Sequence, residues 1–165
     1  MSKKVFLVFL LGLWITGAAT AQNRSVSIRA TAIVMENLQM ITVRDMDLVS
    51  PPIVENRITV NPITSPYAGL FKILGSPNAK IRINYTPRET LVEQNEGVGM
   101  VQAVYSLSAA PEDNQANSFL LTQGNADVTI GSMGVVFLWL GAELDISQAT
   151  MGNYVSEFVL EFEYM

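Results

Sequence analysis

The chain has 165 residues, 49% of them hydrophobic, a formal net charge of −5, and neither cysteine nor histidine. The two missing residue types exclude disulfides, zinc–thiolate sites, cysteine nucleophiles, Ser-His-Asp triads and histidine-ligated metals. The acidic balance and the lack of any basic run argue against nucleic acid and anionic membrane surfaces as partners.

The start of the chain carries the features of a cleavable secretory signal peptide. Lys3 and Lys4 precede an apolar run from Val5 to Ile15, and Ala19-Thr20-Ala21 supplies the small-x-small pattern before Gln22. The apolar run is too short for a spanning helix, which needs about 20 residues. We therefore expect residues 1–21 to be removed and the mature chain, with a formal charge of −7 and no membrane span, to be secreted. Its expected destination is the periplasm, the outer-membrane surface or the extracellular space.

The mature chain, residues 22–165, is predicted to consist mainly of strands. Val26 to Val34 places an apolar residue at every second position, which is the period of a half-buried strand. No segment keeps a 3.6-residue apolar stripe, although Asp145 to Met151 is long enough for one helical turn. The further predicted strands cover 38–43, 57–60, 70–74, 80–85, 101–108, 135–144 and 158–164.

Turn-forming residues separate these strands. They include Gly124-Asn125, Gly131-Ser132-Met133-Gly134 and Met151-Gly152-Asn153. Short strands with turn signals at this spacing predict an antiparallel sandwich or barrel in a single domain. The run from Val135 to Leu140 is apolar on both faces, so we expect it at the centre of a sheet or beneath another element, with Trp139 in the core.

Two pairs of carboxylates have a spacing that could support catalysis or metal binding. Asp45 with Asp47, and Glu161 with Glu163, stand two residues apart, which places each pair on one face of a strand at about 6.7 Å. General acid and base roles or a calcium ion would suit such a spacing. Alternating carboxylates are ordinarily the solvated face of a sheet, and we interpret them so. The sequence therefore predicts no catalytic residue, no cofactor and no metal site.

Four segments together resemble a known family. They are 30–34 (ATAIV), 69–75 (GLFKILG), 140–144 (LGAEL), and the closing stretch of Gly152-x-Tyr154 followed by 158–164. This pattern resembles the secreted bacterial domain of unknown function numbered 4402. The resemblance implies an exported Ig-like or pilin-like β-sandwich with no assigned activity.

The closing stretch also resembles the end of chaperone-usher fimbrial subunits. Gly152 is the fourteenth residue from the end, Tyr164 is penultimate, and Phe158, Leu160 and Phe162 alternate between them. The resemblance implies an incomplete sandwich whose groove accepts a strand from a periplasmic chaperone and then from a neighbouring subunit. These five residues are the candidate assembly strand, and an ordinary final strand in a complete sandwich is the alternative interpretation.

Three functions follow as hypotheses. The leading one is an exported structural or adhesive surface protein, of the fimbrial type, that assembles by β-strand addition and is not an enzyme. The alternative is a monomeric envelope module that binds carbohydrate or another ligand, with Trp139 and Tyr105 as aromatic contacts. A hydrolase using Asp45 or Asp47 is the weakest, because no His, Cys or motif supports it.

Overall fold

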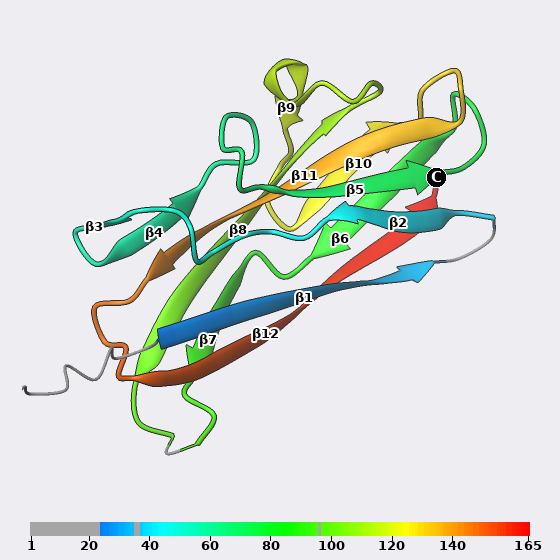
Figure 1. Ribbon diagram of the computed structural model, residues 1–165. Helices are drawn as coiled ribbons and strands as arrows, with labels where there is room; N and C mark the ends of the chain where they lie inside the picture. The colour runs from blue at the N-terminus through cyan, green and yellow to red at the C-terminus, as the bar shows by residue number, and fades with distance from the viewer. Residues whose placement is uncertain (1–23, 35–36, 96) are drawn as a thin grey trace, which may run out of the picture.

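The computed structural model describes residues 24–34, 37–95 and 97–165, and two facing β-sheets make up most of this part of the chain (Figure 1). The predicted all-β sandwich is confirmed. The predicted signal peptide, with its cleavage site between Ala21 and Gln22, lies outside the described residues. Within the described ranges, no helix is long and apolar enough to cross a membrane.

The smaller sheet has four strands, and it joins the two ends of the described chain. Its order is β1 (Arg24–Val34), β12 (Gly152–Tyr164), β6 (Lys80–Tyr85) and β10 (Asn125–Thr129). The pairs β12–β6 and β6–β10 are antiparallel. By contrast, β1 runs parallel to β12, in a register from Arg24 opposite Gly152 to Val34 opposite Phe162. Within the described chain, β12 is therefore the strand that holds β1 in this sheet.

The larger sheet is built around β11 (Val135–Asp145). On one side of β11, β5 and β4 follow each other end to end, with β2 outside β5 and β3 outside β4. On the other side lies β8, flanked by β7 and β9. The bounds are β2 Gln39–Arg44, β3 Ile53–Val54, β4 Arg57–Val60, β5 Gly69–Leu74, β7 Arg88–Val92, β8 Met100–Ala110 and β9 Phe119–Leu120, with a 3₁₀ turn at Gln115–Asn117.

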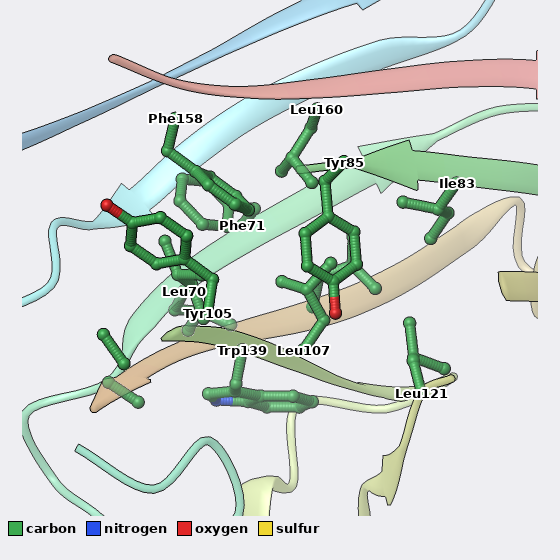
Figure 2. Packing of buried hydrophobic residues seen from close by; sticks show 14 of the residues in the cluster. Leu70, Phe71, Ile83, Tyr85, Tyr105, Leu107, Leu121, Trp139, Phe158 and Leu160 are labelled. Atoms are coloured by element: carbon green, nitrogen blue, oxygen red, sulfur yellow. The ribbon is translucent and has the colours of Figure 1, made fainter. Parts of the chain in front are cut away.

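The central position of β11 explains why its residues are apolar on both faces. Leu138 and Leu140 face the smaller sheet, whereas Trp139 lies on the opposite face and is 1% exposed. A loop covers that outer face, since Ser108 Oγ and Gln115 Nε2 both donate to Pro62 O, at 3.2 and 3.0 Å. The predicted burial of Trp139 beneath another element is confirmed, as Figure 2 shows.

Several details differ from the sequence analysis. Met151-Gly152-Asn153 is not a turn, because β12 already begins at Gly152. Asp145 to Met151 forms no helical turn; Ala149 N donates to Ile146 O at 3.0 Å within a non-helical connection. The predicted turn at 131–134 is confirmed, with Gly134 at φ +76°. The strands β3, β7, β9 and β10 were not predicted.

Candidate functional site

The predicted assembly residues lie in the core between the sheets. Phe158, Leu160 and Phe162 are each no more than 2% exposed. The Phe158 ring lies 4.7 Å from the Tyr105 ring and 5.5 Å from the Tyr85 ring, measured between centroids (Figure 2). β1 pairs with β12 along residues 152–162, and β6 pairs with its far end. These side chains therefore fill a closed interior, and the edge of β12 next to them is already occupied by β1.

The two remaining assembly candidates stand at the ends of β12. The Tyr164 hydroxyl accepts a hydrogen bond from Ser76 N at 2.8 Å. Gly152 has φ +149°, and a Cβ at this position would lie 2.3 Å from Cγ of Glu93. Glu93 is 4% exposed, and its carboxylate accepts hydrogen bonds from Asn95 N and Asn153 N. Gly152 thus permits a buried carboxylate to hold the start of β12 against the turn after β7.

A polar cluster of the buried Tyr105 and Ser156 with the half-buried Glu89 closes the long side of the sandwich between β7 and β12. The Tyr105 hydroxyl donates to Ser156 Oγ at 2.8 Å and lies 3.2 Å from Glu89 Oε2, while Ser156 Oγ donates to the same Glu89 oxygen at 2.5 Å. Burial, which disfavours the phenolate, raises the pKa of Tyr105 to about 12. Because Glu89 and Tyr105 belong to the larger sheet and Ser156 to the smaller one, the cluster joins the two sheets.

The opposite long side, between β1 and β2, has no such closure. In the described chain, β1 pairs only with β12 and β2 only with β5, so each strand leaves one edge of backbone N–H and C=O groups without a strand partner. Figure 1 shows the two strands on the same side of the molecule, where they approach each other. Both faces of β2 are exposed over most of its length, including Ile41 at 38% and Val43 at 53%. We call these two strand edges the open side.

A groove of about 310 Å³ accompanies the open side. Ser27 to Ala30 of β1 line it together with Asp45, which follows β2, and Val155 and Glu157 of β12. Arg29 lies directly opposite Glu157 in the β1–β12 register. The groove therefore carries charges of both signs beside a free strand edge.

The carboxylate pairs are part of the surface. Glu161 and Glu163 are exposed on β12, as the solvated-face interpretation predicts. Asp47 accepts hydrogen bonds from Val49 N and Ser50 N at 2.8 and 3.0 Å. Hydrogen bonds from the Ser50 side chain, then from the Ser50 and Val49 backbone, lower the pKa of Asp47. In the parts of the chain described, no three His, Cys, Asp or Glu side chains gather closely enough to hold a metal ion.

The aromatic contacts named for a carbohydrate site are not on the surface. Trp139 and Tyr105 are each 1% exposed: Tyr105 packs between the sheets, and Trp139 lies on the covered outer face of β11 (Figure 2). Stacking against a sugar requires an accessible ring face. These two residues cannot form such a site in this fold.

No family model matches the chain, and a search of curated proteins finds no similar sequence. The resemblances to the domain of unknown function and to fimbrial subunits therefore remain predictions from their motifs.

Sequence reasoning missed the open side. Its residues on β2, Ile41 to Val43, were predicted only as part of a strand. Their signal is weak: a β-branched run without a charge until Arg44, which is typical both of a buried strand and of an unprotected edge. The parallel pairing that leaves β1 at the edge has no local sequence signal.

Proposed function

We propose that this chain is an exported structural or adhesive surface protein, of the fimbrial type, that assembles with neighbouring subunits by β-strand addition. A periplasmic chaperone would cover the same edges before assembly. The observation that carries the proposal is the open side, where β1 and β2 each present a strand edge that no other described strand pairs with. An added strand would gain main-chain hydrogen bonds from such an edge and specificity from alternate side chains.

The lengths of the edge strands support this choice of surface. Natural sheets protect their edges by making them short or by adding prolines, bulges or charges. The other described edge strands are brief: five residues each in β7 and β10, and two each in β3 and β9. β1 is eleven residues long and contains no proline. β2 has a register shift between Thr42 and Arg44, which confines its regular edge to the first part of the strand.

The assembly edge in this proposal is not β12 itself. Phe158 and Leu160 belong to the core, so deletion of residues 158–165 would test folding before it tested assembly. The open side offers a cleaner test, because its apolar side chains lie outside the core and are much more exposed than Phe158 and Leu160.

The decisive experiment compares two double variants of the exported full chain by size-exclusion chromatography with light scattering. Ile41→Lys with Val43→Lys places charges on the open side, whereas Phe119→Lys with Leu120→Lys places the same charges on β9, an exposed strand beside β8 and away from the open side. We expect the wild type and the β9 control to form concentration-dependent assemblies and the β2 variant to remain monomeric. Equal assembly of both variants, or a wild type that is monomeric at every concentration, would contradict the proposal.

A further inference from the structure

A second hollow lies between the two sheets at the end where β1 begins. Its volume is about 110 Å³. Both sheets and the connection after β11 supply its walls, with Val26, Leu48, Ile58, Val101, Ile146 and Tyr154 among the lining residues. It is separate from the groove beside Arg29, which has a different lining.

The walls of the pocket are predominantly apolar. Among the described lining residues no side chain is charged, and the Tyr154 hydroxyl is the single polar side-chain group. That hydroxyl is already engaged, because it donates to Thr150 O at 3.0 Å and accepts from Thr150 N at 2.9 Å. A water molecule inside would find few hydrogen-bond partners, so the space favours apolar contents.

The mouth of the pocket leaves large apolar side chains in water. Val49 is 82% exposed and Ile53 is 60% exposed, although both belong to the lining. An occupant that touched these two residues would remove apolar surface from water, which is favourable in proportion to the area covered. The exposed side chains and the interior space therefore select the same class of ligand.

We propose that this pocket binds a free small molecule that is uncharged and apolar, about the size of one six-membered ring or a branched alkyl group. Apolar cavities of about 150 Å³ lined by aliphatic and aromatic side chains bind benzene. The neutral walls provide no partner for a carboxylate or an ammonium group, and burying such a charge unpaired is costly. The inference does not rest on strand addition, since the ligand would occupy the space between the sheets in a single chain.

Benzene is the probe for the test, added to the full chain with methyl-labelled Val and Ile and followed by NMR. We expect saturable shifts at the methyl groups of Val26, Val101 and Ile146 and a rise in the unfolding temperature. Benzoate and benzylamine at the same concentrations should produce neither effect. Failure of benzene to shift these methyl groups up to its solubility limit would overturn the proposal, as would equal binding of benzoate.

Two variants and a matched control locate the site. Ala149→Leu adds volume to the lining and should weaken benzene binding at least tenfold. Ile53→Ser changes the exposed mouth, where no core packing is lost, and should weaken binding severalfold even if Ala149→Leu fails to fold. Val159→Leu, on the outer face of β12, should bind benzene as the wild type does. Unchanged binding in Ile53→Ser together with a folded, fully binding Ala149→Leu would contradict the assignment.

Discussion

The two long sides of the sandwich differ in whether the gap between the sheets is closed. Between β7 and β12, Glu89, Tyr105 and Ser156 join the sheets through hydrogen bonds that are partly or fully buried. Between β1 and β2, no described strand bridges the gap, and Ile41 and Val43 face water. Alternation along a strand thus determines which residues share a face, whereas the neighbouring strands determine whether that face is covered.

The difference between the two sides also predicts which substitutions affect folding and which affect association. The closed side consists of buried groups whose partners are internal, so changes there should act on folding. The open side consists of exposed groups and unpaired backbone, so changes there should act on association. The following substitutions test that separation.

The largest effect should come from Phe158→Ala in β12. Phe158 is 2% exposed and contacts the rings of Tyr85 and Tyr105, so its loss should reduce the free energy of unfolding by about 3 to 5 kcal/mol. Val43→Ala on the open side, where the side chain is 53% exposed, should change it by about 0.5 kcal/mol or less. Denaturant titration measures both. Similar losses from the two variants would remove the distinction between the sides.

Gly152→Ala should have the next largest effect. The new Cβ would collide with the Glu93 side chain at 2.3 Å and occupy a backbone region that glycine favours, at a cost of roughly 2 to 4 kcal/mol. Gly97→Ala is the control, because Gly97 has φ +68° but, apart from its chain neighbours, no described atom within 4 Å of its added Cβ. It should cost about 1 to 2 kcal/mol from the backbone alone. Equal losses in the two variants would show that Glu93 does not hold the start of β12.

Two buried tyrosines give a smaller and more specific contrast. Tyr105→Phe removes a hydroxyl that bonds to Ser156 and should cost about 1 to 2 kcal/mol. In the described structure, the Tyr85 hydroxyl is buried without a hydrogen-bond partner, and it points toward Leu107 and Leu121 in Figure 2. Tyr85→Phe should therefore leave stability unchanged or raise it slightly. A greater loss from Tyr85→Phe than from Tyr105→Phe would contradict this assignment.

The smallest effect concerns pH and the exposed face of the smaller sheet. Arg82 Nε donates to Asp127 Oδ1 at 2.8 Å, and this hydrogen bond lowers the pKa of Asp127 below its ordinary value of 3.8. The contribution to stability is therefore present above that value and is lost as the pH falls through the lower folded pKa. In Asp127→Asn, the free energy of unfolding should fall slightly less steeply as the pH drops below about 4. An identical pH dependence in the variant would show that the pair contributes nothing.

The sequence predicted the strands that alternate strongly and missed those that do not. The patterns around Ile28, Ile83 and Phe158 identify β1, β6 and β12 because one apolar face is continuous. β7 (RETLV) and β10 (NADVT) each contain only two apolar residues, too few to stand out from a connection. Their strand character comes from pairing with β8 and β6.

The candidate site was less predictable than the fold. Phe158, Leu160 and Phe162 have the same alternation whether they line an open groove or fill a closed core, and the occupant of the neighbouring edge decides between the two. That occupant is β1, which lies more than 120 residues away along the chain. Gly152 was selected by its position from the end, whereas its physical role depends on Glu93, a contact that no local pattern predicts.

Amide hydrogen exchange of the monomeric chain tests the open side most directly. Since β1 is paired on one side only, every second amide along β1 should exchange quickly while the intervening amides are protected by β12. The amides from Leu160 to Phe162 should all be protected, because β1 and β6 flank that stretch. Uniform protection along β1, or rapid exchange at Leu160 to Phe162, would contradict an edge at β1 and a closed core at β12.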